Sequence, residues 1–221
     1  MSALSPSVVP IFATPLGVVQ LPEASSLNPA VAALLSARAA VDVTASHPQL
    51  PCYRSRDDLL DWTEAPIRKV SSEMLRGVLS VTAAVNEFSD TELQSLTMQA
   101  RGWFTIVRPD GYVPASSHPL TSWCGIYCVE APEPSADRKD SGVLRLYESR
   151  LGTMFADATN STMRIPYTPS HFAWRPVPGQ IAVFPASVRH EIALVRSSGQ
   201  LILVTVRVRF VGPGQEGQSR W

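Results

Sequence analysis

The sequence is poor in the residues that most often reveal a function at first sight. Its 221 residues include only three cysteines and four histidines, and 19 basic residues balance 19 acidic ones. Cys52, Cys124 and Cys128 form no C-x-x-C pair and no disulfide framework, so we expect reduced thiols in a cytoplasmic protein. The charge balance removes any general attraction to nucleic acid or anionic membranes, and we expect neither as a partner.

Other absences narrow the class of protein further. No apolar run reaches the roughly 18 residues that a membrane span needs. The first 19 residues contain three prolines and no basic residue, which is untypical of a signal peptide. A glycine-rich phosphate loop, a G-x-S-x-G elbow, zinc-finger spacing and internal repeats are also missing. A composition of 45% hydrophobic and 17% charged residues remains, which is typical of a globular domain.

The first hundred residues favour helices. Asn28 and Pro29 are typical of a helix start, and they predict a helix over residues 30–41. A short helical turn is expected at residues 56–60. Apolar residues recur every three or four positions over 66–88, which predicts a longer helix with one buried face. Residues 89–92 resemble a capping box that begins another short helix.

Beyond Gly102 the sequence favours strands. Short runs rich in Val, Ile, Leu and aromatics, separated by Gly, Pro, Ser and Asp, predict strands at 103–107, 123–129, 143–147, 181–184, 191–195 and 201–210. We therefore predict a single α+β domain over residues 1–221. Its mostly helical part (1–100) packs on one side of a strand core (101–210), and a tail (211–221) follows.

Two of the four histidines stand at the ends of predicted strands. His118 precedes the strand at 123–129, and His190 opens the strand at 191–195. A jelly roll brings such distant positions together, and imidazole is a good ligand for Fe(II) or Zn(II). Both residues are also compatible with ordinary histidines at loop ends.

Three stretches resemble an Fe(II)/2-oxoglutarate oxygenase family of small phage and bacterial proteins. HPLTSWCGIYC, from His118, is similar to the family pattern HPxSxxSGVYY, and SGVLRLYESR, from Ser141, is similar to GxLxFxDPR. PGQIAVFPASVRH, which ends at His190, is similar to PGxLxLFPSxLxH. The resemblance implies a double-stranded β-helix (jelly-roll) barrel that holds Fe(II), with His118 and His190 as metal ligands and catalytic residues. It also implies 2-oxoglutarate and O2 as co-substrates, and hydroxylation or a related oxidation of a small molecule.

Three positions depart from the family pattern. The family has a His-x-His pair where this chain has Ser116-x-His118. Its pair of tyrosines is replaced by Tyr127 and Cys128, and its arginine for the 2-oxoglutarate carboxylate is missing near Gln200. Cys124 and Cys128 can each be read as a thiolate ligand or as a small buried hydrophobe.

Other side chains are candidates for the missing contacts. If one face of the strand at 201–210 points inward, Arg207 can hold a carboxylate; otherwise Arg207 is hydrated at the surface. We expect Arg207 and Tyr127 at the co-substrate. Arg150, Tyr147 and Trp123 are the candidates for substrate contact, with loop-end charge or core packing as the alternatives.

Three functions follow in order of preference. The first is an Fe(II)- and 2-oxoglutarate-dependent oxygenase. The second is a jelly-roll metalloenzyme that has abandoned 2-oxoglutarate, and the third is a non-catalytic binding module on the same scaffold. The sequence leaves the oligomeric state open, with a homodimer as one possibility.

Overall fold

The computed structural model describes residues 10–42, 51–133, 137–148, 163–167 and 171–213. The helices of this part are α1 (Ala24–Val41), α2 (Ala65–Val85) and α3 (Asp90–Ser95), together with the 3-10 turn η1 (Leu59–Asp61). Pro66 stands in the first turn of α2, and Ser89 caps α3 in a capping box with Glu92, as the sequence predicted.

The start of α1 differs from the prediction. The helix begins at Ala24, and Pro29 lies inside it. Asn28 does not cap the helix; its buried side chain donates to the carbonyl of Val129 at 2.8 Å and accepts from the hydroxyl of Tyr127. These tertiary hydrogen bonds hold Asn28 inside the helix, where local propensity alone places a cap.

In the described part of the chain, ten strands form two antiparallel sheets. The six-stranded sheet has the order β1-β8-β5-β10-β3-β2, and the four-stranded sheet has the order β4-β9-β6-β7. The larger sheet contains β1 (Gly17–Gln20), β2 (Cys52–Arg54), β3 (Thr97–Val107), β5 (Trp123–Glu130), β8 (Gln180–Pro185) and β10 (Leu201–Val211). The smaller sheet contains β4 (Val113–Ser116), β6 (Leu144–Tyr147), β7 (His171–Trp174) and β9 (His190–Ile192). This arrangement confirms the predicted double-stranded β-helix, although the two sheets remain separate in strand pairing among the described residues.

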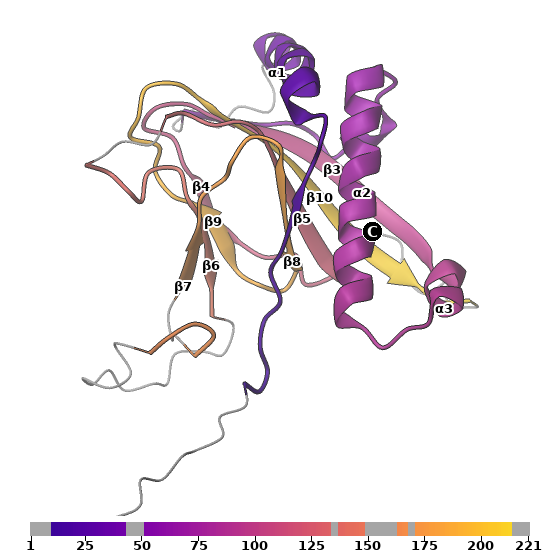
Figure 1. The fold of residues 1–221 in the computed structure, drawn as a ribbon. Coiled ribbons are helices and arrows are strands. Elements are labelled where there is room, and N and C mark those ends of the chain that lie inside the picture. Colours follow the sequence, from indigo (N-terminus) through magenta and orange to yellow (C-terminus); the bar gives the residue numbers. More distant parts are fainter. Residues whose placement is uncertain (1–9, 43–50, 134–136, 149–162, 168–170, 214–221) are drawn as a thin grey trace, which may run out of the picture.

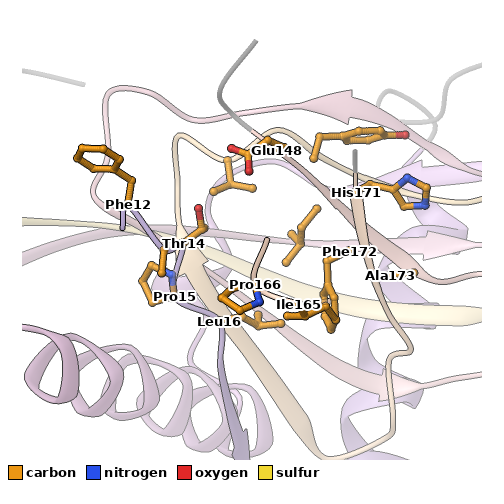
Figure 2. A pocket seen from close by; sticks show the side chains of 14 residues that line it. Phe12, Thr14, Pro15, Leu16, Glu148, Ile165, Pro166, His171, Phe172 and Ala173 are labelled. Atoms are coloured by element: carbon orange, nitrogen blue, oxygen red, sulfur yellow. The ribbon is translucent and has the colours of Figure 1, made fainter. Parts of the chain in front are cut away.

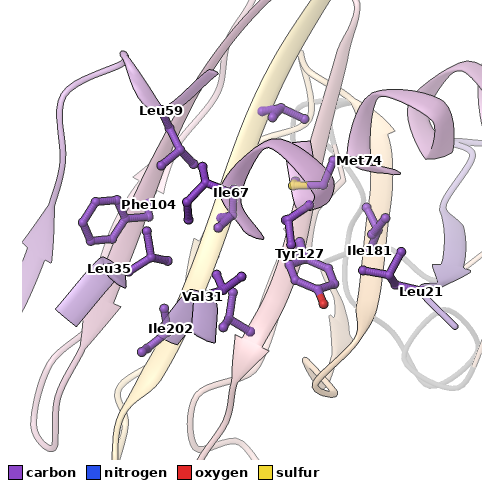
Figure 3. Close-up of a cluster of buried hydrophobic side chains, with 14 of the residues drawn as sticks. Leu21, Val31, Leu35, Leu59, Ile67, Met74, Phe104, Tyr127, Ile181 and Ile202 are labelled. Atoms are coloured by element: carbon purple, nitrogen blue, oxygen red, sulfur yellow. The ribbon is translucent and has the colours of Figure 1, made fainter. Parts of the chain in front are cut away.

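The large sheet separates two apolar clusters. Helices α1 and α2 cover one face, called here the outer face (Figure 1), and the cluster beneath them includes Met74, Phe104 and Tyr127 (Figure 3). The other face, called here the inner face, meets the small sheet through residues such as Ile126 and Leu144. Because side chains alternate along a strand, each central strand supplies both clusters.

None of the helices in the described part of the chain combines the length and the hydropathy that crossing a membrane requires.

Candidate metal centre

The two predicted ligands come together between the sheets. His190 begins β9 and pairs with Ser116 of β4, while His118 lies two residues beyond the end of β4. The backbone N–H of His118 donates to the carbonyl of Ala186 at 2.7 Å, which fixes this loop beside β8. The two imidazole rings have centroids 5.5 Å apart and lie at 63°.

A thiol completes the group from the large sheet. Cys124 of β5 points to the inner face and is fully buried. Each of the residues His118, Cys124 and His190 offers one potential ligand atom, and these three atoms lie within 4.8 Å of one another. Within the described residues, this is the one cluster of three or more His, Cys, Asp or Glu side chains with such spacing.

Each ring has one nitrogen suited to a metal. The Nδ1 of His190 lies 2.9 Å from the carbonyl of Val188, so this nitrogen carries the proton and Nε2 keeps its lone pair. The Nε2 atom of His118 is buried and has no hydrogen-bond partner in the part of the chain that the structure describes. A buried nitrogen without a partner is unusual in a folded protein, and an ion between the rings would satisfy it.

The surroundings keep both rings neutral. Burial lowers the pKa of His118 to about 4, with further lowering by His190 and Arg207. Burial also lowers the pKa of His190, against the opposing effect of its hydrogen bond to Val188. Neutral imidazole is the form that binds metals, so both rings are ready to ligate at neutral pH.

Aromatic and charged groups wall the centre. The ring of Trp103 lies edge-on to His118 with centroids 5.3 Å apart, and the guanidinium of Arg54 lies 4.4 Å from the centroid of the Trp103 ring. Asp57 accepts from Arg54 at 2.5 Å through one carboxylate oxygen and from Arg207 at 2.9 Å through the other. Both oxygens of this nearby carboxylate are therefore occupied by arginines.

The face of β10 that carries Thr205 and Arg207 points toward the small sheet, which is the first of the two alternatives predicted for this strand. Leu201, Leu203 and Thr205 are buried there, and Arg207 stands opposite Cys124 in the β10–β5 pair. Arg207 is thus a guanidinium beside the metal cluster, where it suits a carboxylate. Ile126 and then Cys128 occupy the next inner positions on β5, so the space deeper between the sheets is mostly apolar.

Two of the other predicted site residues lie on the outer face. Tyr127 is buried against the helices, and its hydroxyl donates to Asn28 at 2.5 Å. Burial raises the pKa of Tyr127 to about 12. Trp123 packs in the same helix-side cluster. Their predicted roles at co-substrate and substrate stay predictions, because these two side chains lie in the helix-side cluster, whereas His190 packs against Phe184 on the other face of the sheet.

A cavity of about 480 Å³ lies at the small sheet, where His171 and Phe172 of β7 face Pro15 and Leu16 across it (Figure 2). Tyr147, predicted to contact substrate, lines it, whereas Arg150 falls outside the described residues. Two further lining residues adjoin His190, because Leu146 is its partner on β6 and the carbonyl of Val188 bonds its ring. The remaining walls are mainly apolar and include Phe12, Thr14, Pro15, Leu16, Ile165, Pro166, His171 and Phe172.

Sequence reasoning missed most of this lining. Residues 11–16 resemble the opening stretch of the family, but residues 10–16 show no alternation or helical periodicity and β7 carries mostly exposed side chains, so the pattern of neither segment indicates a place in the site. The three family-like motifs, at residues 118–128, 141–150 and 178–190, include neither of these two segments. Only their contiguity with β6 and His190 in space identifies them as part of the site.

Residues 101–205 match the family described as "Putative 2OG-Fe(II) oxygenase". The match runs from within β3 to within β10 and includes both His118 and His190, and it confirms the family resemblance predicted from the sequence motifs. No curated protein matches the chain significantly.

Solved structures share the fold at low sequence identity. A prolyl-4-hydroxylase from Pseudomonas putida has a TM-score of 0.57 at 14% identity, over 89% of this chain and 93% of that chain. AviO1 from Streptomyces viridochromogenes Tue57 has a TM-score of 0.56 at 12% identity, over 92% of each chain. HygX from Streptomyces hygroscopicus, solved with nickel and 2-oxoglutarate bound, has a TM-score of 0.56 at 11% identity, over 94% of this chain and 86% of that chain.

Proposed function

We propose that this chain, similar in fold and family motifs to 2OG-Fe(II) oxygenases, is an Fe(II)-dependent oxygenase that uses 2-oxoglutarate to oxidise a small organic substrate. One observation carries the proposal: two neutral histidines, of which His190 is buried and His118 half-buried, converge, and the Nε2 atom of His118 has no hydrogen-bond partner among the described residues. This is the state of a ligand pair prepared for a metal. The free thiols fit the reducing compartment expected from the sequence.

His118 and His190 would hold the iron through Nε2. The bound iron supplies the activation of O2, which neutral protein side chains cannot provide. The chain's own contribution is orientation and exclusion of water. The carbonyl of Val188 fixes the ring of His190, while Phe184 and Trp103 pack against the two imidazoles with ring centroids 5.0 Å and 5.3 Å away.

Arg207 would hold the far carboxylate of 2-oxoglutarate. It lies on the inner face beside Cys124, and buried Thr205 offers a hydroxyl one pleat away on the same face. Binding would exchange the Asp57 carboxylate for that of the co-substrate. The overall reaction consumes 2-oxoglutarate, O2 and a substrate C–H bond, and yields succinate, CO2 and a C–OH group.

The substrate would bind in the cavity next to His190. Leu146, Phe172 and Val188 give it an apolar wall, and Tyr147 and Glu148 add polar groups. This lining suits a compact, largely apolar molecule that carries one or two polar groups. Arg150, six residues after Leu144 in sequence, remains a candidate for substrate contact.

A second function is favoured by a separate observation. Arg207 is already paired with Asp57, and the space beyond Cys124 is lined by Cys128, Leu201 and Leu203. An enzyme that has abandoned 2-oxoglutarate would have this apolar interior. It would consume O2 in the presence of metal and substrate without forming succinate.

Anaerobic Fe(II) titration followed by succinate measurement tests the proposal. We expect one iron per chain, loss of binding in His118→Ala and His190→Ala, and unchanged binding in His171→Ala, which removes a histidine outside the cluster. Succinate should form from 2-oxoglutarate in the presence of O2. Metal binding with O2 uptake but no succinate would favour the second function, and absence of metal binding in the folded protein would leave a non-catalytic module.

A further inference from the structure

We infer that Cys124 is the third protein ligand of the metal, so that two imidazoles and one thiolate hold the ion. This inference rests on the proposed metal-dependent function, and it specifies a donor set different from two histidines and a carboxylate. It concerns a residue that comes from the large sheet, while His118 and His190 lie on and beside the small sheet.

The spacing of the donor atoms carries the inference. Metal–nitrogen bonds of about 2.0–2.1 Å and a metal–sulfur bond of about 2.3 Å place neighbouring donors roughly 3–4 Å apart. The three donors here already lie within 4.8 Å of one another. Cys124 is anchored in the middle of the large sheet, between Arg207 of β10 and Phe184 of β8. A closing movement of about 1 Å by the two rings would complete the site.

The alternative ligands are worse placed. Asp57 is the acidic residue whose charge acts on His118, but its two oxygens accept hydrogen bonds from Arg54 and Arg207. Ser116 stands opposite His190, where the family pattern predicts another histidine, but it is exposed and carries a neutral hydroxyl. Among the described residues, no carboxylate joins the cluster of the two histidines.

Cys128 shows how a cysteine with a purely structural role looks in this chain. It lies on the same strand and the same face as Cys124, and both are fully buried. Its thiol contacts the carbonyl of Glu130 at 3.6 Å, and it does not belong to the cluster. The two residues therefore share burial, strand and chemistry, and differ in their distance from the histidines.

In this buried position the thiolate form of Cys124 requires a bound cation. Burial raises the pKa of the Cys124 thiol to about 12, and the guanidinium of Arg207, its direct neighbour on β10, opposes only part of that rise. Coordination forms the metal–sulfur bond and releases the thiol proton to solvent. A sulfur donor makes the site softer, so its preference for Zn(II) and Co(II) over Mn(II) should exceed that of a site with a carboxylate.

Cobalt(II) is a suitable probe because thiolate ligation gives an intense near-ultraviolet charge-transfer band. We expect this band when Co(II) is added to the metal-free wild-type protein without oxygen. Cys124→Ser should lose the band and bind Co(II) at least about 10-fold more weakly, since even an outer-shell partner contributes 10- to 100-fold. Cys128→Ser should keep both the band and the affinity.

X-ray absorption of the wild-type protein gives a second readout that needs no variant. A sulfur neighbour at about 2.3 Å is expected. A bound metal with only nitrogen and oxygen neighbours would overturn the inference, as would a charge-transfer band that survives in Cys124→Ser. If either of these outcomes came with succinate formation, the proposed function would stand without Cys124 as a ligand. A sulfur neighbour without succinate formation would exclude only the use of 2-oxoglutarate.

Discussion

The two faces of the large sheet are built from the same strands but carry different kinds of buried polar group. On the outer face, the buried side chain of Asn28 has partners: it accepts a hydrogen bond from the Tyr127 hydroxyl and donates to the carbonyl of Val129. Elsewhere on that side, the Nε1 atom of Trp62 and the Oγ atom of Ser71 have no partner among the described residues, and on the inner face the same holds for the Nε2 atom of His118. A satisfied polar pair stabilises a fold, whereas a buried, unsatisfied nitrogen costs free energy unless a ligand occupies it. Because the unpartnered nitrogen of His118 belongs to a cluster of potential metal ligands with Cys124 and His190, the inner face is the candidate for chemistry.

Replacing one buried phenylalanine on each face should give the largest loss of stability and the sharpest contrast between the faces. Phe104 lies on the outer face and Phe184 on the inner face, and both are fully buried. Each change to alanine should lower the free energy of unfolding by about 3–5 kcal/mol in urea titrations. Only Phe184→Ala should also weaken metal binding, because this ring packs against His190. Equal metal affinity in the two folded variants would break the distinction.

Arg207 tests whether the inner face binds a carboxylate. Arg207→Gln removes a charged hydrogen bond worth about 1.5–3 kcal/mol, so the Kd for 2-oxoglutarate should rise roughly 10- to 100-fold in calorimetry. Arg209→Gln is the matched control, because Arg209 follows on the same face of β10 but lies opposite Gln99, away from Cys124. A co-substrate affinity that is unchanged in Arg207→Gln would count for an enzyme without 2-oxoglutarate.

Tyr127 probes the outer face with a smaller change. Tyr127→Phe leaves the buried Asn28 oxygen without its donor and should lower the free energy of unfolding by about 1–2 kcal/mol. The affinities for metal and 2-oxoglutarate should stay as in wild type. A weaker affinity for 2-oxoglutarate would restore the role at the co-substrate that the sequence suggested for this tyrosine.

The pH dependence of the metal-free protein should show the smallest effect. Because the pKa of His118 is lowered to about 4 from 6.5, the unfolded chain binds the proton first. The stabilisation is complete above pH 6.5 and is lost as the pH falls toward 4. With allowance for solvent screening of a half-buried ring, the change is on the order of 1 kcal/mol. The comparison is the unfolding free energy of wild type and His118→Ala at several pH values; parallel curves would contradict the assignment.

The sequence predicted the central strands well and missed the edge strands. All four missed strands, β1, β2, β4 and β7, are the outermost strands of their sheets. An edge strand has one neighbour, so it is shorter, more exposed and open to residues such as Pro114. Central strands such as β5 and β10 are buried on both faces and give the continuous apolar runs that the prediction used.

The candidate site was predictable in part. The quoted motifs identified His118 and His190, because each stands at a strand end in a recognisable pattern. Whether Tyr127 or Cys128 faces inward depends on the register between β5 and β10, which a single strand does not reveal. The pairing of Arg207 with Asp57 joins residues 150 apart in the sequence, so local pattern could not predict it.

The most direct test of a metal centre on the inner face is a crystal structure of the iron-loaded protein, with anomalous data collected at the iron edge. We expect one strong anomalous peak between the Nε2 atoms of His118 and His190 and the Sγ atom of Cys124. A peak elsewhere, or an empty site in crystals grown with excess Fe(II), would contradict it.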